Sequence, residues 1–169
     1  SLLIVGCRNA LLVNYELNMK YFDSLDKDRF NKYLSNFMNE NNFEEVFDLK
    51  KYRMVPGIYV LVLDKYKQVY IGLSERGITE RIKQHWNAKD PERLIFGRAF
   101  NSVLSIDSFG ALDTTRIFIK TKGNLYAVEN KIVDEFDDKY LLNRTIGGIG
   151  SSYTYTTNEA EALVAIAAN

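Results

Sequence analysis

The feature that most constrains the fold is a run of alternating apolar residues at positions 55–74, VPGIYVLVLDKYKQVYIGLS. Two stretches rich in Val, Ile, Leu and Tyr flank a polar segment at residues 64–68, which is typical of a β-hairpin. Ten residues separate two tripeptides in this run, Gly57-Ile58-Tyr59 and Tyr70-Ile71-Gly72. Antiparallel pairing brings Tyr59 and Tyr70 near each other on neighbouring strands. The hairpin alone favours two tyrosines that serve only packing, because Tyr is common in strands.

The segment that follows, residues 78–86, has the pattern of an amphipathic helix. Ile78, Ile82 and Trp86 recur at a spacing of four and form an apolar stripe. Arg81 and His85 lie one helical turn apart at the border of this stripe, so their side chains can converge. A helix packed on the hairpin would present a guanidinium and an imidazole near the two tyrosines. The alternative is an ordinary surface helix with a solvated Arg and the only His of the chain.

A second helix is predicted at residues 123–136, and it contains a carboxylate on its apolar side. Apolar residues repeat at helical spacing, and Glu129 falls within their arc. An ionised carboxylate on a buried face is costly unless it is paired or binds a metal. Asn143, farther along, precedes a glycine-rich turn and by itself indicates only a turn.

Taken together, these segments resemble the GIY-YIG nuclease superfamily over roughly residues 56–148. Both tripeptides stand at the family's usual separation, and the other family positions follow in order. The matching positions are Tyr59, Tyr70, Arg81, His85, Glu129 and Asn143. The resemblance implies an α+β fold with a small antiparallel three-stranded sheet flanked by helices. This agrees with the pattern of hairpin, helix, a third strand at residues 116–122, and helix.

The resemblance also implies a DNA endonuclease that uses one divalent metal, Mg²⁺ or Mn²⁺. Glu129 would bind the metal, because a hard cation that keeps most of its waters needs only one or two protein oxygens. Arg81 would hold the scissile phosphate with its planar donors. Tyr59 would be the general base, which at neutral pH requires its pKa to fall by about 2 to 3 units. Tyr70 and His85 would orient water or phosphate, and Asn143 would support the nearby loop.

One position departs from the pattern of many family members. Repair enzymes of the family often place Lys directly after YIG, where it could help the tyrosine lose its proton. Here that residue is Leu73, followed by Ser74. Other branches of the family also lack this Lys. We expect the metal, Arg81 or Arg76 to supply the positive field instead.

Composition limits the class of protein. The 169 residues suit a domain of ordinary size, and no segment approaches the 18 or so apolar residues of a membrane span. The only cysteine, Cys7, excludes a disulfide framework and favours a reducing compartment, so we expect a cytoplasmic protein. The first residue is Ser1 rather than Met, which is consistent with a processed end, an expression remnant or the cut edge of a longer chain.

The charge balance argues against strong DNA binding by the chain alone. Lys plus Arg equals Asp plus Glu at 22 each, so no overall field attracts a polyanion. Residues 76–98 carry six basic against three acidic side chains, which could be a phosphate track or an ordinary solvated face. The family resemblance implies DNA as the partner, and since such nucleases commonly take affinity and specificity from attached domains, we expect an additional recognition domain or protein to contribute.

The remaining segments are expected to support this domain. Residues 1–53 are predicted to be mainly helical and packed on the core, with one helix at residues 26–40 and a second helix whose apolar face spans residues 43–47. Residues 54–150 form the nuclease-like domain, and residues 151–169 form a tail that ends in a helix. A short strand at residues 2–5, a short helix from Asp90 through Phe100 and a mobile loop at residues 145–150 are also predicted.

Three functions from different classes stay open from sequence. The first is an active metal-dependent DNA endonuclease, because a competent residue fills each family position. The second is a nucleic-acid-binding module without catalysis, which the neutral charge and Leu73 favour. The third is a structural or protein-interaction domain, which leaves Glu129 on an apolar stripe without a reason.

Overall fold

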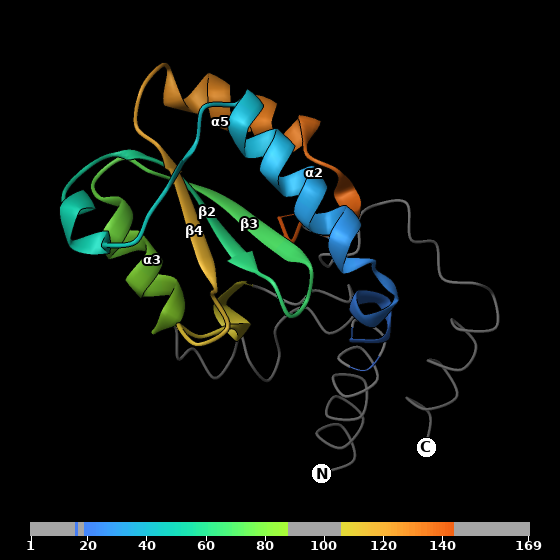
Figure 1. Cartoon of the computed structure of the whole chain (residues 1–169). Helices are drawn as coiled ribbons and strands as arrows, with labels where there is room; N and C mark the ends of the chain where they lie inside the picture. Colours follow the sequence, from blue (N-terminus) through green and yellow to red (C-terminus); the bar gives the residue numbers. More distant parts are fainter. Residues whose placement is uncertain (1–15, 17–18, 88–105, 144–169) are drawn as a thin grey trace, which may run out of the picture.

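The computed structural model describes residues 16, 19–87 and 106–143. Its centre is a four-stranded antiparallel sheet in the order β1-β4-β2-β3. Helices α2 and α5 cover one face and α3 packs on the other (Figure 1). The general α+β class with flanking helices agrees with the sequence prediction, whereas the sheet has one more strand than the three predicted. The predictions for residues 2–5, 90–100, 145–150 and 151–169 lie outside the described residues.

The predicted hairpin is strands β2 (Gly57–Leu63) and β3 (Gln68–Ser74). Every residue of β2 is buried, because this strand lies inside the sheet with helices on both faces. The register pairs Tyr59 with Gly72 and Leu61 with Tyr70, so the two tyrosines are diagonal neighbours on one face. Strand β4 (Arg116–Lys120) pairs with the other side of β2 and is two residues shorter than predicted.

The prediction of a second helix at residues 43–47 is wrong, because this segment contains the additional strand β1 (Glu44–Glu45). Phe43 and Val46 are three residues apart in the sequence, and this spacing does not distinguish a helix from a short extended segment. Asn42 has a left-handed backbone (φ 55°), which ends α2 (Lys27–Glu40) and turns the chain toward β4. The backbone then pairs with the free edge of β4, where Val46 N–H donates to the Ile117 carbonyl at 2.8 Å.

The helices follow the predicted boundaries closely. Helix α3 spans Ile78–Trp86, as predicted, and α5 spans Leu125–Glu135. Asp26 caps α2 by accepting a hydrogen bond from Arg29 N–H at 2.8 Å. The described residues also form short 3₁₀ helices, which are η1 (Leu49–Tyr52), η3 (Ile106–Ser108) and η4 (Asp138–Tyr140). None of the helices in the described ranges is both long and apolar enough to cross a membrane.

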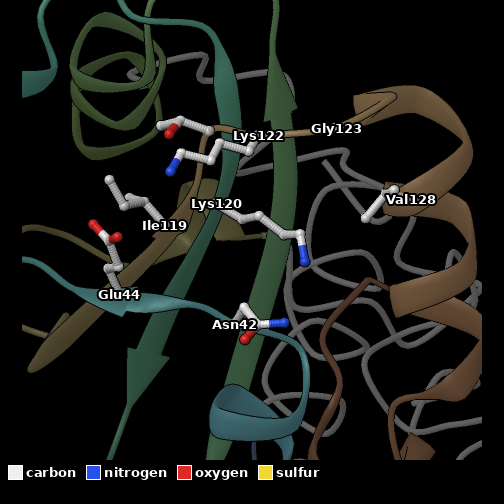
Figure 2. A pocket seen from close by; sticks show the side chains of 8 residues that line it. Asn42, Glu44, Ile119, Lys120, Lys122, Gly123 and Val128 are labelled. Atoms are coloured by element: carbon white, nitrogen blue, oxygen red, sulfur yellow. The ribbon is translucent and has the colours of Figure 1, made fainter.

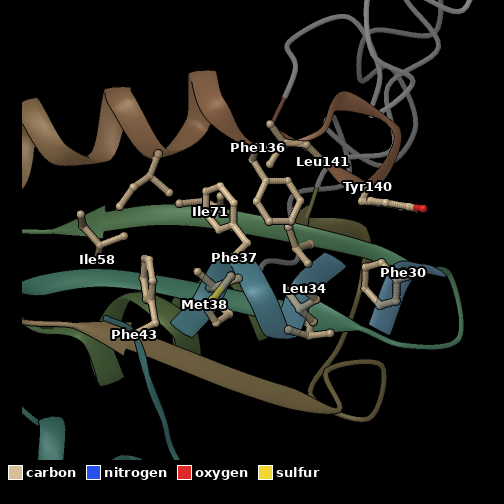
Figure 3. Close-up of a cluster of buried hydrophobic side chains, with 14 residues drawn as sticks. Phe30, Leu34, Phe37, Met38, Phe43, Ile58, Ile71, Phe136, Tyr140 and Leu141 are labelled. Carbon is tan, nitrogen blue, oxygen red and sulfur yellow. The ribbon is translucent and has the colours of Figure 1, made fainter. Parts of the chain in front are cut away.

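Two hydrophobic cores lie on opposite faces of the sheet. The first, which we name the α2/α5 core, joins Phe30, Leu34 and Phe37 of α2 to Phe136 and to the sheet (Figure 3). The Phe37 and Phe136 rings meet edge to face at 4.8 Å between centroids, which holds the two helices side by side. Residues before position 54 thus share a core with the sheet. The second, the α3 core, surrounds Tyr59 with residues of α3 and η3.

Candidate active site

Two of the predicted site residues, Tyr70 and His85, lie beside Tyr59 in the α3 core. Tyr59 is fully buried, and its hydroxyl lies 2.8 Å from His85 Nε2. The Tyr70 ring packs against the His85 ring at 5.1 Å between centroids and against the Tyr59 ring at 6.3 Å. The hairpin register and the helical stripe of α3 together bring these three side chains into one cluster.

The other ring nitrogen of His85 is engaged by a residue that sequence reasoning missed. Asp107 in η3 places Oδ1 at 2.7 Å from His85 Nδ1. A carboxylate can only accept, so Nδ1 carries the proton and Nε2 is free to accept the hydroxyl proton of Tyr59. His85 therefore hydrogen bonds to protein at both nitrogens and is not directed at solvent. No sequence signal marks Asp107, since it lies in a three-residue turn without a motif.

Burial determines the protonation states of Tyr59, Tyr70 and His85. It raises the pKa of Tyr59 above its ordinary value, although the Arg81 charge opposes this effect. Burial also raises the pKa of Tyr70, again opposed by Arg81. The pKa of His85 is lowered, first by burial, with Asp107 acting in the opposite direction. Thus, in the protein alone, Tyr59 is a phenol and His85 is a neutral imidazole at neutral pH. The direction for Tyr59 is therefore opposite to the lowered pKa that the sequence analysis expected.

Arg81 lies on the exposed side of α3, close enough that its charge acts on both phenols. Its Nη1 donates to Gln84 Oε1 at 3.0 Å. It forms no ion pair with any residue that the structure describes. A guanidinium that is exposed and lacks a carboxylate partner can accept a phosphate as its counterion.

Glu129 lies on α5, on the face of the sheet opposite to α3. Its charge raises the pKa of both Tyr59 and Tyr70, which places it within electrostatic range of them. Burial raises the pKa of Glu129 itself. Within the described ranges its carboxylate has no hydrogen bond or ion pair, and these ranges contain no group of three His, Cys, Asp or Glu side chains placed to hold a metal. Asp107 is engaged by His85, so Glu129 is the carboxylate of this site that has no protein partner among the described residues.

Asn143 lies beside the edge strand β3 rather than in the ring cluster. Its Oδ1 accepts from Ile71 N–H at 2.7 Å, and its Nδ2 donates to the Ile71 carbonyl. Both backbone groups of the residue next to Tyr70 are therefore satisfied by one amide. Leu142 N–H also donates to the Val69 carbonyl at 2.8 Å, so this segment covers the end of the edge strand.

A groove of about 580 Å³ opens next to Arg81, between α3, the end of β3 and the start of α5. Arg76 and Arg81 line it together with Leu73 and the exposed side chains of Met54 and Tyr126. Leu73 occupies the position after the second tripeptide and contributes an apolar wall. The charges of Arg76 and Arg81 are balanced in this lining by Glu75 and Glu80, and Tyr126 adds an exposed aromatic ring.

A second pocket, of about 520 Å³, lies where β4 leads into α5 (Figure 2). It is lined by Asn42, Glu44, Lys120 and Val128 among others. Lys120 Nζ donates to the Asn41 carbonyl at 2.5 Å, so this cation is already used inside the fold. None of the predicted catalytic residues lines this pocket.

No protein-family model, curated protein or solved structure matches the chain. Its function must therefore be inferred from the residues and their geometry.

Proposed function

We propose that the chain is a metal-dependent endonuclease of the GIY-YIG type that hydrolyses DNA phosphodiester bonds. The observation that carries this proposal is the buried Tyr59 hydroxyl, held 2.8 Å from His85 Nε2 and within range of both Arg81 and Glu129. A proton acceptor lies at the phenol, and a cation for phosphate and a carboxylate for metal lie within electrostatic range of it. Metal-assisted phosphodiester hydrolysis uses groups of these three kinds.

The phenol and the imidazole together can activate water. As Tyr59 Oη takes a proton from the attacking water, its own proton passes to His85 Nε2, which is unprotonated because Nδ1–H donates to Asp107. The resulting hydroxide attacks phosphorus, and the bond from phosphorus to the leaving sugar oxygen breaks. That oxygen takes a proton from solvent. Because the proton moves on to His85, Tyr59 can act without a lowered ground-state pKa.

Arg81 stabilises the charge that develops on the phosphate. Its planar donors suit two non-bridging oxygens of the phosphate, and its fixed positive charge stabilises the dianionic transition state. Among the described residues Arg81 forms no ion pair with a carboxylate, although Glu75 and Glu80 line the adjoining groove. Arg76 lines the same groove, where a bound strand would bring a neighbouring phosphate.

Glu129 fits a site for Mg²⁺ or Mn²⁺. Its carboxylate is partly removed from water, lacks a protein partner among the described residues and lies within range of the phenols. Mg²⁺ keeps several waters and is commonly held by one or two carboxylates together with substrate phosphate. When bound, such an ion supplies positive charge that polarises the phosphoryl oxygens.

A test is to incubate the protein with supercoiled plasmid and with a branched DNA, each with Mg²⁺ or Mn²⁺. The variant Glu129→Ala is the negative variant. Glu135→Gln is its matched control, since Glu135 is an exposed carboxylate on the same helix, 3.7 Å from Lys131. We expect cleavage by wild type and Glu135→Gln and none by Glu129→Ala. Cleavage that survives Glu129→Ala would contradict the role assigned to this carboxylate.

A second candidate is a nucleic-acid-binding module of the same fold that does not cleave. The zero net charge and Leu73 favour it, because both reduce the positive field near Tyr59. DNA binding without cleavage by folded wild-type protein would select this alternative. If folded protein neither binds nor cleaves DNA, and a longer form of the protein also does neither, a protein-interaction domain is favoured.

A further inference from the structure

Asp107 contacts the proposed catalytic cluster from outside the segments that carry the sequence pattern. It lies in η3, between the buried Ile106 and the nearby buried Phe109, which are 6% exposed each. These two side chains anchor the turn in the α3 core. The carboxylate is thereby fixed against the inner edge of α3, where His85 Nδ1 lies 2.7 Å from Oδ1. The side chains of His85 and Asp107 are 5% and 16% exposed, so little water competes for this bond.

We propose that Asp107 is a positioning residue that holds His85 as the Nδ1–H tautomer and aims Nε2 at the Tyr59 hydroxyl. A neutral imidazole has one donor and one acceptor nitrogen, and its partners decide which is which. Because the carboxylate can only accept, its contact with Nδ1 leaves Nε2 as the acceptor. The reversed tautomer would point an N–H at the phenol and a lone pair at the carboxylate.

The arrangement is a hydrogen-bonded chain in which the tyrosine hydroxyl occupies the place of the serine hydroxyl in the Ser-His-Asp triad of serine hydrolases. Its order is Tyr59 hydroxyl, His85 imidazole, Asp107 carboxylate. When His85 receives the phenol proton it becomes an imidazolium, and the carboxylate next to it stabilises the positive charge. The catalytic consequence of this inference rests on the proposed nuclease function, whereas the tautomer of His85 does not.

The other charged and titratable groups near His85 do not select a tautomer. Arg81 only lowers the pKa of the ring through its charge, and Tyr70 meets the ring edge to face. Tyr59 can donate or accept, so it follows whichever tautomer is present. Asp107 is the partner that imposes the choice.

The chain contains a single histidine, so ¹⁵N NMR of the imidazole reports on His85 without assignment by mutation. We expect the wild type at neutral pH to carry its proton on Nδ1. In Asp107→Asn the amide can donate to the ring, and we expect the proton to move in part or fully to Nε2. Asp113→Asn is the control, because Asp113 lies in the same region but accepts from Gly110 N–H, at 2.8 Å, and forms no hydrogen bond or ion pair with His85 among the residues that the structure describes. That variant keeps the wild-type tautomer.

Two further readouts separate positioning from general support of the fold. Asp107 raises the pKa of His85, so Asp107→Asn should lower the titration midpoint of the ring while the amide spectrum stays that of a folded protein. In cleavage assays we expect kcat to fall on the order of 100-fold with little change in KM. Asp107→Ala, which cannot donate to the ring, should lower the midpoint and kcat in the same way.

The possible outcomes distinguish this inference from the proposed function. An Nε2–H ring in the wild type, or a ring whose tautomer and titration midpoint are both unchanged in folded Asp107→Ala, overturns the role of Asp107 even if the protein cleaves DNA. An Nδ1–H ring that changes in Asp107→Asn supports the role even if no DNA is cleaved, in which case the nuclease function alone fails. Full kcat in Asp107→Asn with an altered tautomer overturns the catalytic part of the hydrogen-bonded chain.

Discussion

Gly72 lies directly opposite Tyr59 on the neighbouring strand, and a Cβ at position 72 would overlap the Tyr59 phenol. The last residue of the second tripeptide thus leaves space for the last residue of the first. Gly57 has a similar role at the start of β2, where a Cβ would lie 2.7 Å from Ile78 Cδ1 and 2.8 Å from the Lys120 carbonyl. Both glycines are explained by close packing around the tyrosine and α3, and neither has a left-handed backbone.

Gly72→Ala should therefore displace the phenol from His85. Overpacking of this kind costs about 1 to 3 kcal/mol in the free energy of unfolding. We expect a lower Tm and loss of cleavage, because the hydroxyl can no longer reach Nε2. Gly110→Ala is the control, since the nearest atom to a new Cβ there is Asp113 Oδ2 at 3.9 Å. Equal thermal stability and cleavage for the two variants would show that position 72 has room for a side chain.

Asn143→Ala should destabilise the edge strand. The variant leaves the N–H and carbonyl of Ile71 without their partner, and an unsatisfied buried group costs about 1 to 3 kcal/mol. Urea unfolding measures the loss. Asn130→Ala, on the exposed side of α5, should change the free energy of unfolding by less than about 0.5 kcal/mol. A similar small effect at both positions would mean that water replaces the amide at β3.

The buried, neutral His85 should make stability depend on pH. Its pKa in the folded protein lies below the ordinary value of 6.5, so on acidification the unfolded chain takes up a proton before the folded one. Stability from this residue is present above pH 6.5 and is lost as pH falls below it. We expect the wild type to lose more free energy of unfolding than His85→Gln between about pH 7 and pH 5.

The groups that face His85 are Tyr59, Tyr70, Arg81 and Asp107, and they are the same in both proteins. The difference between the two curves therefore isolates the ring. Parallel curves for wild type and His85→Gln would contradict a lowered pKa.

Metal binding should be visible as thermal stabilisation. At a free Mg²⁺ or Mn²⁺ concentration of about 100 Kd, binding adds about 2.7 kcal/mol, or roughly 5 to 10 °C in Tm for a chain of this size. We expect this shift for wild type and Glu135→Gln, its removal by a chelator, and no shift for Glu129→Gln. An equal shift in Glu129→Gln would place the metal elsewhere.

Much of the fold follows from local patterns in the sequence. The alternation at residues 57–74 and the stripe of Ile78, Ile82 and Trp86 predict the hairpin and α3, because both periods reflect the face that is buried. The same periods place Tyr59, Tyr70 and His85 in one cluster.

Two features could not be predicted in this way. Strand β1 has only two residues, too few for a period, and forms because β4 has a free edge. Asp107 lies 22 residues after His85 in the sequence and meets it only through tertiary packing of η3. The state of Tyr59 also depends on burial, which raises its pKa against the effect of Arg81, and the balance of the two cannot be judged from residue types.

The most direct test of the central claim compares cleavage of supercoiled plasmid and branched DNA by wild type, Tyr59→Phe and Tyr33→Phe, with Mg²⁺ at neutral pH. Tyr33 is the matched control, because its hydroxyl accepts from Asp137 N–H at 2.7 Å in the α2/α5 core, away from the site. Its loss should cost about 1 kcal/mol in stability and leave cleavage intact. We expect cleavage by wild type and Tyr33→Phe, and a rate at least about 100-fold lower for Tyr59→Phe. Full cleavage by Tyr59→Phe, or no cleavage of either DNA by folded wild-type protein, would contradict the account.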